Sequence, residues 1–351
     1  MTGGTRRICV IIPTNNRQYY LGEVIKYWEN SEFDIIICDS TIHKYEEIAN
    51  HNVEYVHYPE EKFPEKVYRT IIEKNVKEQY DFVVFSADDD FVYLDSIGKC
   101  VDFLINNKDY GSVRGQFLSY EYEGGSSIQL NPPYKDELDL DYGEDTAYER
   151  IKHFHSVKAE VVWGVYQADV IYNIFRDMHS ANLPTYNELE THGICLFALM
   201  YGKHKICPFF YGMREASIYS VGSCAKRLVE IINSDEYTKE VENYFNAIAI
   251  GLRRIDGIEF EQAYDFVKNE TNQLVKLYAD INSNSKSRLL TLKKCLKNVR
   301  VFRFVKILIK HKKSKVKSLY KTFRPIAAEN KILLEEVRFI EAAIVKRGKT
   351  R

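Results

Sequence analysis

Three consecutive aspartates, Asp88, Asp89 and Asp90, follow the apolar run 82–85 (FVVF). Adjacent carboxylates repel one another unless a cation neutralises them, and Mg²⁺ or Mn²⁺ binds carboxylates together with the oxygens of a diphosphate. Alternation along an extended chain turns Asp88 and Asp90 to one side and Asp89 to the other. We therefore expect Asp90 and Asp88 to be metal ligands and Mn²⁺ or Mg²⁺ to be the cofactor. A solvated acidic turn that caps the next helix is the alternative.

Two other expected strands, 8–12 (ICVII) and 35–38 (IIIC), also end in polar residues. The first is followed by Pro13-Thr14-Asn15-Asn16-Arg17 and the second by Asp39-Ser40-Thr41. Ligands of open α/β sheets bind at the carboxyl ends of the strands. We therefore expect these residues and the aspartates to lie along one edge of a sheet.

Short apolar runs that alternate with helical patterns predict the elements that hold these residues. Continuous apolar strands of this length indicate a parallel sheet covered on both faces. Polar residues 123–142 predict a loop, and residues 110–122 predict paired strands. The expected strands are 8–12, 35–38, 53–57, 82–85, 161–166 and 206–211. The expected helices are 21–28, 66–77, 94–105, 169–178, 188–201, 228–232, 238–253, 259–277 and 331–345.

Three motifs in order, ICVIIPTNNR, IIICDST and FVVFSADDDF, resemble those of nucleotide-sugar glycosyltransferases of the GT-A fold, closest to the inverting family 2 type. The resemblance covers about residues 7–215 and includes the family's Asp-x-Asp motif. It implies an α/β fold with a Rossmann-like mixed sheet, a catalytic domain at 1–222, and a helical C-terminal region at 223–351. It also implies that the nucleotide-sugar is bound by Pro13, Thr14, Arg17, Asp39, Asp88 and Asp89, with Asp90 on the metal.

The family draws its general base from an acidic pair at the start of a helix after the aspartates. Here the sequence NELETH stands in that place, a hundred residues after Asp90. A general base takes the proton of the acceptor hydroxyl as it attacks. Glu190 is the first candidate, Glu188 the second and His192 the third, while Thr191 stands where the family usually has Asp. Acidic residues also favour a helix N-terminus for dipole reasons alone.

Further residues are candidates for binding the donor or the acceptor. In the family a basic residue near the start of the 66–77 helix approaches the nucleotide, which suggests Arg69; a solvated helix face is the alternative. Arg214, after the last strand, could clamp the leaving diphosphate where negative charge develops. Trp163 resembles the aromatic residue under the acceptor sugar, or else packs in the core, and His192 is a second acceptor candidate.

The charge of the chain is unevenly distributed. Residues 286–324 hold fifteen Lys or Arg and no Asp or Glu, whereas residues 1–285 hold 28 basic and 46 acidic residues. Apolar residues interleave with the basic ones at helical spacing, which predicts an amphipathic helix on an anionic membrane surface. Packing on the domain or on a second subunit is the alternative. No nucleic-acid module is visible, so nucleic acid is not an expected partner.

Composition is that of a soluble globular protein, with 45% hydrophobic and 28% charged residues. The seven cysteines form no CxxC pair, which predicts reduced thiols in a cytoplasmic protein, at most peripheral on the inner face of the plasma membrane. The start of the chain does not resemble a signal peptide. The predicted function is a metal-dependent, inverting glycosyltransferase that moves a sugar from a nucleotide-diphosphate donor to a glycan or lipid-linked acceptor in bacterial surface polysaccharide synthesis. The alternatives are a nucleotidyltransferase acting on a sugar phosphate, which would be expected to begin with a Gly-rich motif, and a non-catalytic nucleotide-sugar-binding protein.

Overall fold

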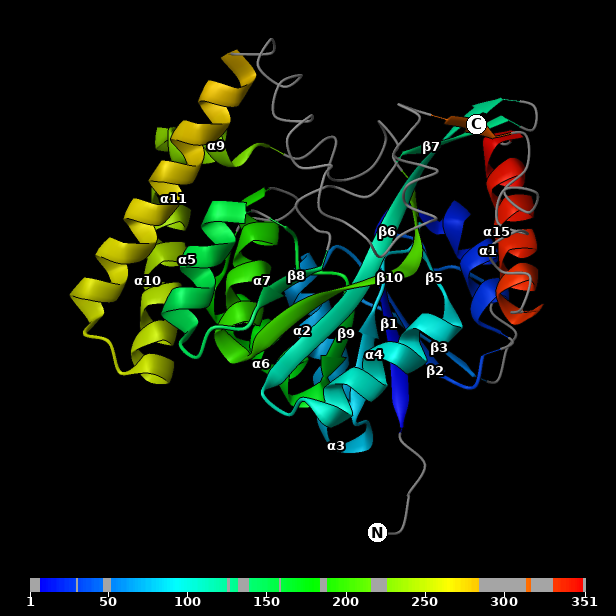
Figure 1. Ribbon diagram of the computed structural model, residues 1–351, viewed down its shortest axis with the longest axis horizontal. Helices are drawn as coiled ribbons and strands as arrows, with labels where there is room; N and C mark the ends of the chain where they lie inside the picture. Colours follow the sequence, from blue (N-terminus) through cyan, green and yellow to red (C-terminus); the bar gives the residue numbers. More distant parts are fainter. Residues whose placement is uncertain are drawn as a thin grey trace.

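A mixed sheet runs through the molecule in the order β11-β7-β6-β9-β4-β1-β2-β3 (Figure 1). The computed structural model describes residues 7–29, 31–46, 52–124, 127–131, 139–157, 159–183, 188–215, 226–283, 314–316 and 331–349. Its parallel part consists of β1 (Ile8–Thr14), β2 (Asp34–Asp39), β3 (Val53–His57) and β4 (Phe82–Phe85). β9 (Gly164–Gln167) pairs antiparallel with β4, so the predicted α/β class with a mixed sheet is confirmed.

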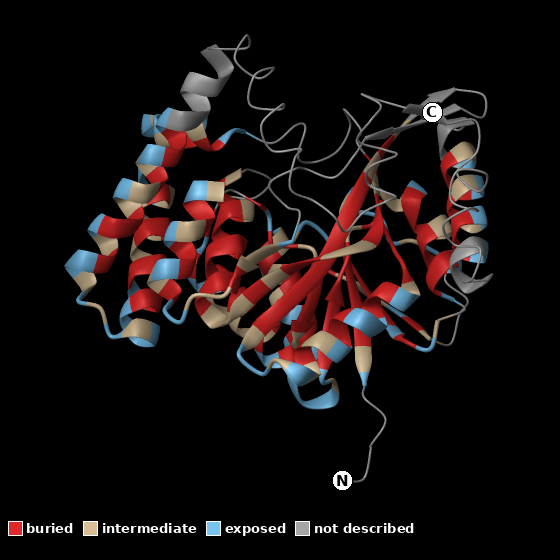
Figure 2. Ribbon diagram, viewed as in Figure 1, coloured by how far each residue is buried: buried red, intermediate tan, exposed pale blue. Residues whose placement is uncertain are grey.

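Each central strand is buried on both faces, as its continuous apolar sequence predicts. In β1, Cys9 and Ile11 belong to one core cluster, and Val10 and Ile12 belong to the other. Burial is therefore continuous across the sheet (Figure 2). The helices on the first face are α2 (Phe63–Glu73), α3 (Val76–Gln79), α5 (Ala147–Val157), α6 (Ala168–Ala181) and α7 (Glu188–Tyr201). Those on the second are α1 (Gln18–Trp28), α4 (Leu94–Asn106) and α15 (Lys331–Lys349).

The strands beyond β9 differ from the expectation. In place of paired strands over residues 110–122, the chain forms one long strand, β6 (Tyr110–Gly124), which runs parallel to β10 (Lys203–Glu215). Part of the expected loop 123–142 is β7 (Ser127–Asn131) and β8 (Leu140–Tyr142), and residues 125–126 and 132–138 lie outside the described part. Pairing explains the difference, because β7 hydrogen-bonds β6 and β8 hydrogen-bonds β10.

β10 also pairs with the two-residue strand β5 (Phe91–Val92), which directly follows the three aspartates. The pairing is close at Gly212, where a Cβ would lie 2.4 Å from the carbonyl oxygen of Phe91. Only glycine allows the backbones to approach in this way. β5 therefore ties the aspartates to the end of β10.

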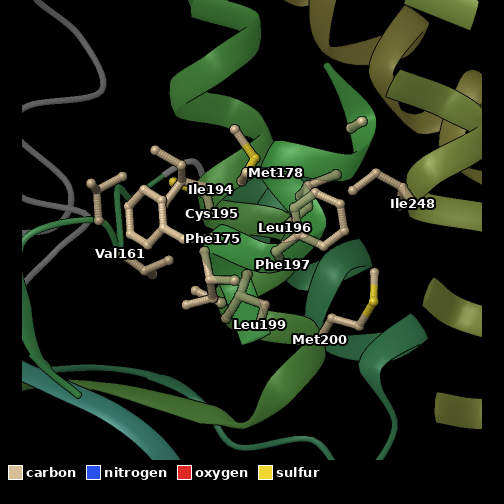
Figure 3. Packing of buried hydrophobic residues seen from close by; sticks show 14 of the residues in the cluster. Val161, Phe175, Met178, Ile194, Cys195, Leu196, Phe197, Leu199, Met200 and Ile248 are labelled. Carbon is tan, nitrogen blue, oxygen red and sulfur yellow. The ribbon is translucent and has the colours of Figure 1, made fainter. Parts of the chain in front are cut away.

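After residue 226 the chain is helical, as predicted, over α9 (Leu228–Ile232), η2 (Asp235–Tyr237), α10 (Thr238–Asp256) and α11 (Phe260–Ser283). α10 ends at Gly257, whose φ of 69° is the left-handed conformation typical of a glycine after a helix. α10 packs against α7, and Figure 3 shows Ile248 of α10 beside the apolar side chains of α7. All but one of the residues from Leu189 to Met200 are buried.

The C-terminal helix α15, which belongs to the predicted helical C-terminal region, packs on the sheet. Val337, Ile340 and Ile344 belong to the core cluster of the sheet, and α15 lies beside α1 (Figure 1). β11 (Ser314–Val316) pairs with β7 and so also belongs to the sheet. The expected boundary near Gly222 and most of the basic segment 286–324 lie outside the described residues. Within the described residues, the helices are too short or too polar to cross a membrane.

Candidate active site

A cavity of about 300 Å³ opens where β1 and β4 end. It is lined by Pro13, Thr14, Asn15, Arg17, Phe63, Lys66, Ala87, Asp88, Asp89, Asp90, Glu160, Val162, Trp163, Glu190, Thr191, Ile194, Arg214 and Glu215. Most of the predicted site residues are in this set. Those outside it are Asp39, Arg69, Glu188 and His192.

The three aspartates form a turn rather than an extended chain. The amide of Asp90 donates to the carbonyl oxygen of Ala87 (3.3 Å), and the strand resumes only at Phe91. Alternation therefore does not apply, and the expectation that Asp89 points away from the other two is corrected. All three side chains are buried and line the cavity.

Residues at the end of β1 and just after it hold two of these carboxylates. The hydroxyl of Thr14 donates to Asp88 Oδ2 (2.6 Å). The guanidinium of Arg17 lies 3.2 Å from Asp88 Oδ1 and also hydrogen-bonds Asp89. Arg17 is itself held over the ring of Tyr20 at 4.5 Å. The predicted meeting of the first and fourth strand ends is thus confirmed, with an arginine as the link.

Asp90 is held from the other side of the cavity. Its Oδ2 lies 3.3 Å from Nε of Arg214, and the same arginine reaches Glu160 at 3.6 Å and covers the ring of Phe117 at 4.3 Å. Asp90 Oδ1 is buried and has no hydrogen-bond partner among the described residues. Burial raises the pKa of Asp90 to about 7 and that of Asp88 to about 6, against the opposing effect of the arginines.

The donor set fits a divalent cation only in part. An unpaired carboxylate oxygen on a buried aspartate is the ligand type that Mg²⁺ or Mn²⁺ prefers. Among the described residues, however, no three His, Cys, Asp or Glu side chains are grouped to hold a metal on their own. A cation here would therefore complete its shell with oxygens of a bound ligand, as is usual for Mg²⁺ beside phosphates.

Lys66 is a cation of the cavity that the sequence analysis did not select. Its ammonium group donates to the carbonyl oxygen of Thr14 and to Ser40 Oγ (2.9 Å), and its side chain is buried. Burial lowers its pKa, while Cys38 and nearby carboxylates, Glu190 among them, act in the opposite sense. Lys66 shares the buried stripe of α2 with Val67 and Thr70. The helical spacing of Lys66 relative to these buried residues is the signal in the sequence that could have identified it.

Arg69 lies on the exposed side of the same helix. It pairs with Glu61 and with Glu73 (2.7 Å), and its guanidinium lies 4.5 Å from the ring centroid of Tyr58. Lys66, and not Arg69, is therefore the basic residue of α2 that lines the cavity.

Asp39 is buried below the cavity and does not line it. Its Oδ1 accepts from the amide of Thr41 (2.7 Å), and its Oδ2 accepts from Gln18 (2.8 Å) and from the hydroxyl of Tyr55 (2.7 Å). Both oxygens of Asp39 thus accept hydrogen bonds, from the segments after β1 and β2 and from β3.

Only one of the three base candidates faces the cavity, because α-helical residues are about 100° apart. Glu190, with Thr191 and Ile194, is on the cavity side of α7. Glu188 is bound to the start of α9, where it pairs with Arg227 (2.6 Å) and accepts from the amide of Leu228 (2.7 Å). The predicted alternatives for the base thus occupy different environments.

His192 points into the core and not toward an acceptor. Its ring hydrogen-bonds the hydroxyl of Tyr244 and lies 5.1 Å from the ring of His155. Burial lowers the pKa of His192 well below its usual value. Because it lies two positions after Glu190 on a helix, it faces about 200° away from the cavity.

Trp163 packs in the core and also lines the cavity. It stacks on Phe85 with ring centroids 5.0 Å apart, and it is partly exposed in the same cavity as Glu190. A sugar ring can pack its C–H groups on such an aromatic surface.

No family model and no curated protein matches this chain. Solved structures of S. aureus TarS are similar to it at 12–14% identity. TarS 1–349 covers 98% of this chain, which covers 92% of that one, with a TM-score of 0.47. The structure of TarS 1–349 in complex with UDP-GlcNAc covers 78% of this chain, which covers 92% of that one, with a TM-score of 0.45. A longer TarS chain gives a TM-score of 0.40, and this chain spans 55% of it. Likeness of this degree is too distant to assign a function.

Proposed function

We propose that this chain is a metal-dependent glycosyltransferase that moves a sugar from a nucleotide-diphosphate donor to a hydroxyl group of a glycan or lipid-linked acceptor. One observation supports it most strongly. The aspartate turn, the cations Arg17, Lys66 and Arg214, and the carboxylate of Glu190 all line the same cavity. Cationic side chains suit an anionic ligand such as a diphosphate, and carboxylates suit the metal ion that accompanies it.

The donor half of the cavity consists of the turn and the three cations. Asp88 and Asp90 would hold a divalent cation, and Arg17 and Arg214, which contact these aspartates, would bind the diphosphate. That cation would screen the charge of the diphosphate when bound. Lys66 fixes the loops after β1 and β2 through Thr14 and Ser40 and adds a buried positive charge.

Glu190 is the proposed general base. It would take the proton of the acceptor hydroxyl as the acceptor oxygen forms a bond to the anomeric carbon. The bond from that carbon to the diphosphate oxygen then breaks, and its electron pair leaves with the diphosphate. Arg214 is suited to stabilise the charge that develops there. A single displacement of this kind inverts the anomeric configuration.

Trp163 and Thr191 are the proposed acceptor contacts, because they line the cavity beside Glu190. The acceptor that we propose is a surface polysaccharide or its lipid-linked precursor. The basic segment 286–324, which lies almost wholly outside the described residues, would bring the enzyme to an anionic membrane surface where such an acceptor is found.

A screen of UDP- and GDP-sugars for thermal stabilisation with and without Mn²⁺ tests the donor half. Assays of sugar transfer and of donor hydrolysis then test turnover. A protein that binds a donor but never turns it over would be the non-catalytic alternative. Release of pyrophosphate from a nucleoside triphosphate and a sugar phosphate would instead identify a nucleotidyltransferase.

A further inference from the structure

The aspartate turn is also supported from outside the cavity, by the C-terminal helix. Glu336 of α15 is 9% exposed. Its Oε1 accepts a hydrogen bond from the backbone amide of Leu94 (2.9 Å) and one from the hydroxyl of Tyr27 (3.0 Å). α15 and α1, which carries Tyr27, lie side by side (Figure 1).

Leu94 is the first residue of α4, where backbone N–H groups lack partners within the helix. The residue before it, Tyr93, makes no side-chain cap. Glu336, 242 positions further along the chain, supplies the missing acceptor. A carboxylate also suits the positive end of the helix dipole. Glu336 therefore caps the N-terminus of α4 through its side chain, from a distant helix.

Three residues separate this cap from Asp90. Two of them form β5, which pairs with Gly212 and Met213 of β10, next to Arg214. The hydroxyl of Tyr27 also contacts the carbonyl oxygen of Val92 (2.8 Å). Backbone groups on both sides of Tyr93 are thus fixed by the pair Tyr27–Glu336.

α15 makes a second polar contact at its far end, between Lys346 and Glu23 of α1. The Lys346 side chain is 62% exposed, and an exposed ion pair contributes little. Glu336 is buried, and one of the two groups it contacts, the amide of Leu94, belongs to the segment that carries Asp90. It is therefore a contact through which α15 can act on the cavity.

We propose that Glu336 is a positioning residue for Asp90, so that the C-terminal helix sets the geometry of the donor site. This inference rests on the proposed function of the cavity. It assigns to a helix far from the cavity in sequence a part in binding the donor.

The test compares Glu336→Ala and Glu336→Gln with Glu335→Ala, which removes an exposed carboxylate from the adjacent position of the same helix. Affinity for UDP and for GDP, each with Mn²⁺, is measured by calorimetry on folded protein. We expect Glu336→Ala to lower the affinity for the nucleotide that binds more tightly about tenfold, and Glu335→Ala to leave that affinity unchanged. Glu336→Gln should restore most of the affinity, because an amide oxygen still accepts from Leu94.

Hydrogen exchange provides a readout that does not depend on the donor. Glu336→Ala should speed exchange at residues 91–97 at least tenfold, with little change in the rest of the sheet. If Glu336→Ala does not fold, Tyr27→Phe takes its place, since it removes the hydroxyl and keeps the ring that packs on Phe91. Unchanged exchange at 91–97 would overturn the inference. If the wild-type protein binds nucleotide, an unchanged nucleotide affinity in Glu336→Ala would also overturn it. A wild type that binds neither nucleotide counts against the proposed function, and exchange still decides on Glu336.

Discussion

Nε of Arg214 lies 3.3 Å from Asp90 Oδ2, so the end of β10 supplies positive charge to the carboxylate proposed to bind a metal. An arginine and a divalent cation then compete for one aspartate. Arg214→Gln should therefore tighten the binding of Mn²⁺ alone several-fold and weaken the binding of a nucleotide diphosphate with Mn²⁺. Calorimetric titration of both ligands measures the two effects. Weaker Mn²⁺ binding in the variant would contradict the competition.

Asp90→Asn should abolish the metal-dependent part of donor binding, because an amide is a poorer ligand for a hard cation. Thermal stabilisation by donor with Mn²⁺ and with EDTA measures this part. Asp95→Asn is a matched control, since Asp95 is exposed at the start of α4 and pairs with Lys99. Metal-dependent stabilisation that persists in Asp90→Asn would refute the role of Asp90.

Glu190→Gln should leave donor affinity intact and lower turnover at least about a hundredfold, the usual scale for a general base. The comparison is Glu188→Gln, which weakens contacts with Arg227 and Leu228 outside the cavity. We expect that variant to lose thermal stability with little change in turnover per folded molecule. Loss of turnover in Glu188→Gln together with normal turnover in Glu190→Gln would instead identify Glu188 as the base.

Stability without ligands should depend on pH through the buried aspartates. Burial raises the pKa of Asp90 from 3.8 to about 7. The folded state then binds more protons than the unfolded state between these values, so the free energy of unfolding falls as pH rises through this window. Asp90→Asn should remove much of this loss, and denaturant unfolding of both proteins at pH 5 and pH 8 measures it. The same pH dependence of the free energy of unfolding in both proteins would count against this role of Asp90.

A test of the basic segment must leave α15 in place. Deletion from residue 286 onward would also remove Val337 and Ile340 from the core, and with them Glu336. Replacing Lys293, Lys294 and Lys297 by Gln is preferable. Each lysine near an anionic surface contributes about 1 kcal/mol, so binding to phosphatidylserine vesicles should fall on the order of a hundredfold. Binding unchanged by the substitutions would argue against a membrane role for this segment.

Local sequence patterns were sufficient for the parallel strands and most helices. Strands 53–57 and 82–85 have their predicted bounds. The second is a continuous apolar run, which a sheet covered on both faces buries completely. Pairing at long range was not predictable in this way. β7 and β8 are only five and three residues long, and they pair with β6 and β10.

The site shows the same division. The meeting of Arg17 with the aspartates follows from strand ends at one edge of the sheet, whereas the turn at Ala87–Asp90 was not predicted. Helical spacing separates Glu190 from Glu188 and His192, since residues two apart on a helix do not share a face, but it does not say which face lines the cavity. The contact of Glu336 was not predictable, because nothing local relates it to Leu94, 242 positions earlier.

The dense packing of α7 has a consequence for protein engineering. Glu190 is in its first turn, and the side chains from His192 to Met200 are all buried. Random libraries over that stretch would return mostly chains that fail to fold, because even single-methylene changes are felt in such a core. Thr191 and Trp163 line the cavity and are only partly buried. Varying these two positions, and leaving the buried stretch from His192 to Met200 unchanged, is therefore the way to alter the proposed acceptor preference.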